Sequence, residues 1–222
     1  MKKTGLLIVI SGFSGVGKGT LVNMLLERCP EEYSLSISAT SRKPKEGEKE
    51  GVSYFFKTRE EFERMIADGL LLEYAVYNDN YYGTPAEYVL QEMNKGKNVI
   101  LEIEVQGGLQ IREKFPGTML LYIVPPSAKE LMRRLVNRGR DSMEDIMRRM
   151  RRSLKETEFI NRYDKVLVND DLETSFQELR NMILSEQDRI NALNEYIENI
   201  REELLDITKG ESNAASVIQG ND

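Results

Sequence analysis

The sequence predicts an α/β fold in which a parallel sheet is flanked by helices. Apolar runs typical of buried strands, such as residues 6–10 and 118–124, alternate with stretches of helical periodicity. The first run passes through a glycine-rich turn into a helix, which is a common strand-to-helix connection in α/β proteins. Loops and short strand patterns interrupt this alternation over residues 36–85, so we expect a mixed or antiparallel insert there.

Local signals set the bounds of the expected elements. The helix of residues 18–28 has an apolar side and stops before Pro30. Thr58, Thr84 and Ser127 are followed by glutamates at the spacing of a capping box and predict three helix starts. The expected helices are 18–28, 58–68, 84–95, 127–138, 142–160 and 172–205, and the expected strands are 6–10, 34–38, 52–56, 70–77, 98–104, 118–124 and 165–168. From Lys209 onward the chain is polar and predicts a frayed tail.

Composition excludes several classes of function. The 222 residues include no histidine and one cysteine, Cys29. Imidazole metal sites, Ser-His and Cys-His nucleophile pairs and an internal disulfide are therefore excluded, and the lone thiol fits a reducing cytosol. A formal net charge of −6 argues against a general nucleic-acid surface, and no apolar run approaches the length of a membrane span. We expect a soluble cytoplasmic protein with small-molecule partners; the sequence leaves its oligomeric state open.

The first strand leads into residues 12–20, Gly-Phe-Ser-Gly-Val-Gly-Lys-Gly-Thr. Glycines allow the backbone to wrap around an anion, with N–H groups and the helix N-terminus directed at phosphate oxygens. Lys18 can reach between β- and γ-phosphates. The pattern predicts a P-loop for a nucleoside triphosphate, against the alternative of a tight turn without a ligand. Gly19 stands where a hydroxyl residue usually follows the lysine, and Thr20 comes one place later.

Two carboxylates end the expected strand of residues 98–104. Side chains alternate along a strand, so we expect Glu102 and Glu104 to share a face, and the carboxyl edge of a parallel sheet is where ligands bind. Glu102 and Thr20 are therefore the candidates for holding Mg²⁺, directly or through water. The alternative is a strand leaving its buried zone, but two acids on a buried side are costly without partners.

Arginines gather between Arg133 and Arg152 around a break at Gly139. The planar guanidinium donates twice and stays charged, which suits phosphate groups during transfer. A solvated helix face would explain several of these residues. We single out Arg138 and Arg149 for the reason that follows.

Several motifs together resemble the guanylate kinase family. They are the residue 12–20 loop, Ser41-Arg-Lys-Pro44, Tyr54-Phe55, Tyr81-Tyr-Gly-Thr84, Leu101-Glu-Ile-Glu-Val-Gln-Gly107, Arg138-Gly139 and Val168-Asn-Asp-Asp171. The resemblance covers the chain to about residue 185. It implies transfer of the γ-phosphoryl group of ATP to GMP or dGMP with Mg²⁺, giving ADP and GDP or dGDP, in purine metabolism and GMP recycling. It also implies a P-loop core (1–35, 86–137 and 153–208), a GMP-binding insert (36–85), a helical lid (138–152) and a flexible tail (209–222).

The resemblance also implies roles for individual residues. Lys18, Arg42, Arg138 and Arg149 would be catalytic. ATP would be bound by Gly12, Phe13, Ser14, Gly15, Val16, Gly17, Lys18, Gly19, Thr20, Arg138 and Asn169. GMP would be bound by Ser38, Arg42, Lys45, Tyr54, Glu73, Tyr82, Thr84 and Glu104.

The chain departs from the family pattern at two places. Lys45 replaces a second phosphate-binding arginine, and Glu102 and Glu104 stand where many members have aspartates. Two other readings remain. A scaffold domain of the same type would usually have an eroded P-loop. A kinase for another nucleotide is the nearer alternative, and Glu73 is the residue that discriminates it, because its change to glutamine should weaken GMP binding if Glu73 reads guanine. A regulatory GTPase is disfavoured because residues 94–97, Asn-Lys-Gly-Lys, miss the aspartate that its guanine motif needs.

Overall fold

The computed structural model describes residues 5–77, 79–139 and 141–218. The chain divides into two compact units, Met1–Arg180 and Asn181–Asp222. The first unit contains both sheets of the described chain. Arg140, inside the predicted lid, and Asn78, inside the predicted insert, lie outside the described residues.

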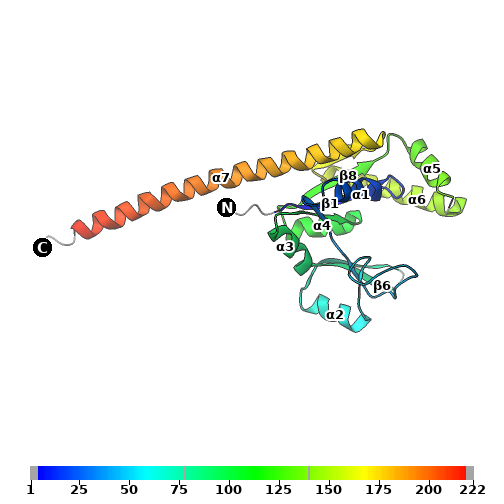
Figure 1. The fold of residues 1–222 in the computed structure, drawn as a ribbon, viewed down its shortest axis with the longest axis horizontal. Helices are drawn as coiled ribbons and strands as arrows, with labels where there is room; N and C mark the ends of the chain where they lie inside the picture. Colours follow the sequence, from blue (N-terminus) through cyan, green and yellow to red (C-terminus); the bar gives the residue numbers. More distant parts are fainter. Residues whose placement is uncertain (1–4, 78, 140, 219–222) are drawn as a thin grey trace. The chain divides into compact units, whose positions relative to one another are not determined.

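A five-stranded parallel sheet forms the core of the first unit, as predicted (Figure 1). Its strand order is β2-β7-β1-β8-β9, so β1 lies in the centre between β7 and β8. The strands are β1 (Leu7–Gly12), β2 (Tyr33–Leu35), β7 (Asn98–Glu102), β8 (Met119–Val124) and β9 (Lys165–Val168). Their central side chains, including Ile8, Ile100 and Leu121, are fully buried, which explains the continuous apolar runs in the sequence.

Helices flank this sheet, and most begin where the sequence predicts. They are α1 (Lys18–Arg28), α3 (Ala86–Asn94), α4 (Val105–Lys114), α5 (Ala128–Asn137) and α6 (Met143–Glu156). Ser127 and Ser142 accept hydrogen bonds from backbone N–H groups three residues later and cap α5 and α6. The predicted helix of residues 142–160 changes at Thr157 into a 3₁₀ segment, η1 (Thr157–Arg162).

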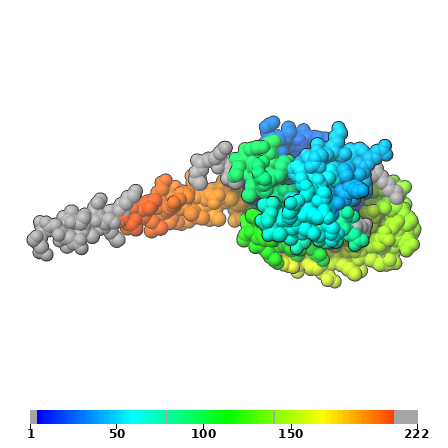
Figure 2. Space-filling view, turned by 90° about the horizontal axis from the view of Figure 1, so that it is seen from below, coloured from blue at the N-terminus to red at the C-terminus, as the bar shows by residue number. Residues whose placement is uncertain are grey.

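The region of residues 36–85 forms a second, mixed sheet beside α2 (Arg59–Ala67). The strand order is β4-β3-β6-β5, from β3 (Ala39–Thr40), β4 (Phe55–Phe56), β5 (Leu71–Tyr77) and β6 (Asn80–Pro85). β3 pairs parallel with β4, whereas the other pairings are antiparallel. Ala39, Phe62 and Leu71 form a small core of its own. Figure 2 shows this insert (cyan) at the surface beside α3 (green). The predicted capping box of α2 at Thr58 is present.

The start of α3 differs from the prediction. We expected a helix cap at Thr84, but residues 80–85 form strand β6 and the N-cap of α3 is Pro85. The Thr84 hydroxyl instead donates to Oε1 of Glu73 at 2.8 Å. A buried carboxylate competes successfully with a helix end for this hydroxyl, because the helix end can be solvated.

Helix α4 was not expected from the sequence. We expected residues 98–104 to be a strand, yet β7 ends at Glu102 and Glu104 is the N-cap of α4. Gly107 and Gly108 weaken the intrinsic helix signal of this segment. Both are needed for close packing. A Cβ at Gly108 would stand 2.9 Å from the Tyr163 hydroxyl, and one at Gly107 would stand 3.3 Å from Glu73 Oε2.

The last helix, α7 (Leu172–Ile218), is longer than predicted. We expected it to end near Leu205 and the chain after Lys209 to fray, but the helix continues to Ile218. Its first turns are tied to the core: Arg28 bonds Glu173 at 2.7 Å and lies over the Phe176 ring, and Arg180 bonds Glu32 at 3.1 Å.

Candidate active site

The P-loop connects β1 to α1 in a conformation that depends on glycine. Gly12, Gly15 and Gly17 all have positive φ, at 153°, 92° and 100°. A Cβ at Gly12 would stand 2.4 Å from the Ile123 carbonyl oxygen, which a rigid backbone cannot accommodate. The loop is also held from outside, because Asn169 Nδ2 donates to the Val16 carbonyl at 2.8 Å. Asn169 is buried and supports the loop in this way.

Lys18 is the first residue of α1 and reaches back over the loop. Its Nζ donates to the carbonyls of Gly12 at 2.6 Å and Phe13 at 3.3 Å. Burial lowers the pKa of the Lys18 ammonium, and the carboxylates of Glu102, Glu104 and Glu156 partly offset this effect. A cation therefore lies against the P-loop with acidic groups nearby.

Glu102 ends β7 next to the P-loop. Its carboxylate oxygens lie 3.6 and 3.8 Å from where a Cβ of Gly19 would stand. The side chain is exposed, so the expectation of an acid on the buried side of the strand is wrong. Thr20, the other predicted Mg²⁺ residue, is exposed on α1. One carboxylate and a hydroxyl at the edge of a nucleotide loop fit Mg²⁺, which keeps most of its water and takes phosphate oxygens.

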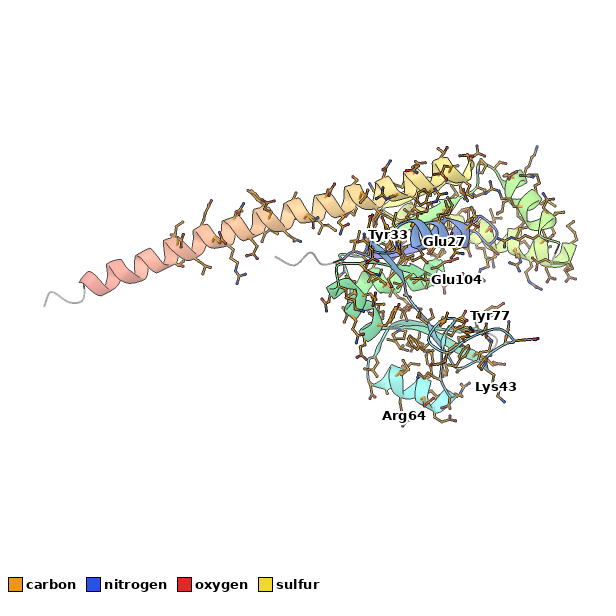
Figure 3. All side chains as sticks on the ribbon, viewed as in Figure 1. Glu27, Tyr33, Lys43, Arg64, Tyr77 and Glu104 are labelled. Atoms are coloured by element: carbon orange, nitrogen blue, oxygen red, sulfur yellow. The ribbon has the colours of Figure 1, made fainter. Side chains whose placement is uncertain are left out.

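Glu104 does not share a strand face with Glu102, because the strand has ended. Its carboxylate pairs with Arg152 of α6, which also bonds Glu156 at 3.0 Å. The neighbouring charge of Glu104, together with burial, raises the pKa of Glu156. In Figure 3, Glu104 lies on the side of the core that faces the insert. The pair Glu104–Arg152 therefore links the start of α4 to α6.

The predicted lid contacts the P-loop through Arg149. Its guanidinium donates to Ser14 Oγ at 2.6 Å and to Asp141 Oδ1 at 3.0 Å. Arg138 caps the C-terminus of α5 and is exposed, and its charge contributes to lowering the pKa of Lys18. The structure thus brings both predicted lid arginines to the P-loop side of the core.

A cavity of about 320 Å³ opens beside the P-loop. Its walls are Gly15, Val16 and Gly17 on one side and Arg134, Asn137 and Arg138 of α5 on the other. Arg134 joins the two sides, since it bonds Glu130 at 2.7 Å and the carbonyls of Val16 and Asp170 at 3.3 and 3.4 Å. In the sequence, Arg134 is only one member of the arginine cluster between Arg133 and Arg152. Its helical spacing from Glu130 is visible in the sequence, but its contacts across 118 and 36 residues are not.

The mixed sheet holds a buried carboxylate, Glu73 of β5. Glu73 is 6 % exposed, and burial raises its pKa, while the hydrogen bond from Thr84 acts in the opposite direction. Gly107 of α4 leaves room for the second carboxylate oxygen. Lys114, also on α4, donates to the Leu72 carbonyl at 2.9 Å. Helix α4 therefore fixes the strand that carries Glu73.

A cationic and aromatic cluster lies on the same sheet. The Arg42 guanidinium lies 5.5 Å from the Tyr54 ring centroid, and the Tyr54 and Tyr82 rings are 6.1 Å apart. Arg42 Nη2 bonds both oxygens of Glu48, at 2.8 and 3.0 Å. This pairing, with a hydrogen bond to Tyr82, raises the pKa of Arg42, and Arg42 lowers that of Glu48.

Two predicted residues lie at the margin of these groups. Lys45 is exposed, and its backbone N–H donates to Glu48 at 2.7 Å. Ser38 directly precedes β3 and is half-buried, and its carbonyl accepts from the Phe55 N–H at 2.9 Å. Glu48, which joins Arg42 to the Lys45 loop, was not singled out from the sequence. The sequence shows only an acidic residue six positions after Arg42 in a polar loop, which is a weak signal for an ion pair.

Comparison with known proteins agrees with this geometry. The guanylate kinase family model matches residues 4–186. The chain belongs to the guanylate kinase family. It is 50 % identical to the guanylate kinase of Bacillus subtilis over 186 residues, covering 84 % of this chain and 91 % of the relative. It is 44 % identical over 203 residues to that of Caldanaerobacter subterraneus subsp. tengcongensis, covering 91 % and 98 %.

A solved structure gives the same result. The guanylate kinase of Anaplasma phagocytophilum aligns with a TM-score of 0.65 at 32 % identity, over 84 % of this chain and 88 % of that one. The resemblance inferred from the motifs is thereby confirmed, and the chain is a kinase of this family. Across the described residues, none of the helices has the length and apolar content needed to cross a membrane. Those residues also contain no group of three or more Asp, Glu or Cys that would enclose a metal unaided.

Proposed function

We propose that this chain transfers the γ-phosphoryl group of ATP to GMP or dGMP in the cytoplasm, with the P-loop side binding the donor and the mixed sheet binding the acceptor. The observation that carries this proposal is the buried Glu73, held by Thr84 on a sheet that also presents Arg42. A P-loop alone would indicate a nucleotide but not a second substrate. A buried carboxylate and a cation on a sheet separate from the P-loop match the two parts of GMP, its base and its phosphate.

The donor side binds ATP phosphates through the backbone of residues 12–20 and through Lys18. Arg138 and Arg149 add positive charge from the lid side, and Arg149 reaches the P-loop through Ser14. The cavity between the P-loop and α5 is suited to the adenosine part of ATP. Asn169 contributes by holding Val16, in addition to any contact with adenine.

The acceptor side reads guanine through hydrogen bonds. The N1–H and exocyclic amine of guanine are donors, and ionised Glu73 accepts from both. Thr84 has one hydroxyl proton, which goes to Glu73, so Thr84 orients the carboxylate and Ser38 is the hydroxyl donor for the acceptors of the base. Glu104 can reach the base only by sharing its carboxylate with Arg152.

The GMP phosphate binds at the cluster of Arg42, Tyr54 and Tyr82. Arginine and tyrosine hydroxyls donate to phosphate oxygens, and the rings hold the guanidinium in place. Glu48 fixes Arg42 from one side. Lys45 supplies a second positive charge from the edge of the loop, but its ammonium cannot form the bidentate hydrogen bonds that an arginine forms with phosphate.

The reaction needs positioning and neutralisation of charge more than proton transfer. The GMP phosphate is already an anionic nucleophile, so the absence of histidine is no obstacle. Lys18 and the arginines stabilise the charge that moves onto the leaving phosphate. Glu102, with Thr20, would hold Mg²⁺ through its water shell, and the ion would neutralise phosphate oxygens.

An ADP-release assay with ATP and Mg²⁺ tests the proposal, comparing GMP, dGMP, AMP, UMP and CMP as acceptors. We expect turnover with GMP and dGMP and little with the others. Turnover with another base would contradict our assignment of Glu73. No turnover with any acceptor, in a folded protein, would favour a scaffold role.

A further inference from the structure

The second compact unit of the chain carries an apolar stripe that the proposed function does not use. Within α7, residues 190, 193, 197, 200, 204 and 207 are all Ile or Leu. Their spacing alternates strictly between three and four residues. This is the a/d pattern of a heptad repeat, in which the apolar side chains line one seam of the helix.

The stripe is open to solvent. Leu193, Ile197, Ile200, Leu204 and Ile207 are 40 to 60 % exposed, and Glu198 is the only residue from 191 to 208 that is not classed as exposed. Most of the stability of helices in proteins comes from packing of an apolar face and not from intrinsic propensity. A continuous row of exposed large apolar side chains is also unusual for a surface with no partner. The stripe therefore needs a covering surface.

The residues at the e and g positions, which flank the apolar stripe, indicate what covers it. In a parallel pair of these helices, Arg189 would face Asn194, Tyr196 would face Arg201, and Glu203 would face Thr208. None of these pairs brings like charges together. Arg201 also bonds Glu198 within its own helix, at 3.5 Å, away from the a/d positions. The a positions are Ile190, Ile197 and Leu204, and the d positions are Leu193, Ile200 and Ile207. The first a/d pair favours two strands, whereas isoleucine at d favours three or four, so the stripe indicates a coiled coil of two or more copies.

The charge of the segment argues against other occupants. Residues 186–208 contain seven acidic residues and two arginines. An anionic membrane or a nucleic acid would be repelled by this surface, and interfacial helices usually carry basic polar faces. We propose that residues 190–208 pair with the same segment of a second copy of this chain, forming a short coiled coil.

Sedimentation velocity of the full chain over a range of concentrations tests the proposal. We expect a concentration-dependent dimer or higher assembly, and a monomer for Ile197→Lys at the same concentrations. The matched control is Asn199→Lys, which adds the same charge on the exposed outer side of the helix and should assemble like the unmodified chain. Circular dichroism should show that Ile197→Lys keeps a folded core and loses only part of the helical signal.

Three results would overturn the proposal. One is a monomer at all concentrations for the unmodified chain. Another is an assembly that Ile197→Lys leaves intact, because a different surface would then hold the copies together. The third is equal loss of assembly in Ile197→Lys and Asn199→Lys, which would point to net charge and not to the stripe.

Discussion

The two sides of the proposed site are built in different ways. The donor side is a single continuous loop in which backbone conformation does most of the work, with Gly12, Gly15 and Gly17 at positive φ. The acceptor side is assembled from side chains on separate strands, with Glu73 on β5 and Thr84 on β6 held against α4. A contiguous glycine-rich loop can be recognised in the sequence. A cluster of side chains from separate strands can be recognised only in the structure.

The largest expected effect is on the donor side. Lys18→Ala should lower kcat by about a hundredfold or more, because it removes a cation from the phosphates during transfer. KM for GMP should change little, since Lys18 is on the donor side. Steady-state kinetics and a thermal melt check this. Turnover close to that of the unmodified chain, in a folded variant, would contradict the assignment.

Two glycine substitutions test whether the conformation of the P-loop requires glycine at positive φ. Gly17→Ala puts a Cβ at φ 100° and 2.6 Å from Asn169 Nδ2, so KM for ATP should rise about tenfold and Tm should fall. Gly19→Ala is the control, because its φ is not positive and its Cβ would meet Glu102 only at 3.6 Å. We expect it to change KM for ATP by less than about threefold. Equal effects of the two changes would refute the argument.

On the acceptor side, Glu73→Gln should raise KM for GMP by about ten- to a hundredfold, the value of one hydrogen bond to a charged group. The amide would present a donor to the donors of guanine. KM for ATP should stay unchanged, which separates the two sides. Isothermal titration with GMP gives an independent readout, and unaltered GMP affinity would exclude Glu73 from base recognition.

The smallest expected effect is a shift in pH dependence. Burial raises the pKa of Glu73 above the ordinary value of 4.5, so its protonation as pH falls begins at higher pH than for a typical glutamate. Since the protonated form loses an acceptor, KM for GMP should rise as pH falls through this range. Thr84→Val removes the hydrogen bond that lowers this pKa and should move the rise to higher pH. A pH profile identical in the Thr84→Val and unmodified chains would show that another group is responsible.

Prediction from the sequence succeeded where local physics decides. The apolar strands of the parallel sheet, the caps of α2 and α5, the start of α6 and the position of the P-loop all show in contiguous residues. It failed where tertiary contacts override local preference. Thr84 looks like a helix cap until Glu73 is buried beside it. The segment of α4 looks like a loop because Gly107 and Gly108 serve packing and not helix propensity.

The same reasoning explains the outcomes for individual side chains. Arg149 was singled out and does contact the P-loop, whereas Glu104 was expected to lie on a strand that in fact ends before it. Glu48, Arg134 and Arg152 were missed as individual residues. Each acts through a partner that no local pattern specifies.

The central strand also has a consequence for how the chain folds. Leu7 of β1 pairs with Val99 of β7, so the whole insert lies within the loop that this pairing closes. Strands β5 and β6, by contrast, are neighbours in sequence and pair from Tyr77 and Asn80 outward. Local hairpins form in microseconds, while closing a long loop is slow and entropically costly. The insert should therefore acquire structure first and shorten the loop that the parallel sheet has to close. An amide-exchange pulse during refolding would find β5 and β6 protected before β1 and β7.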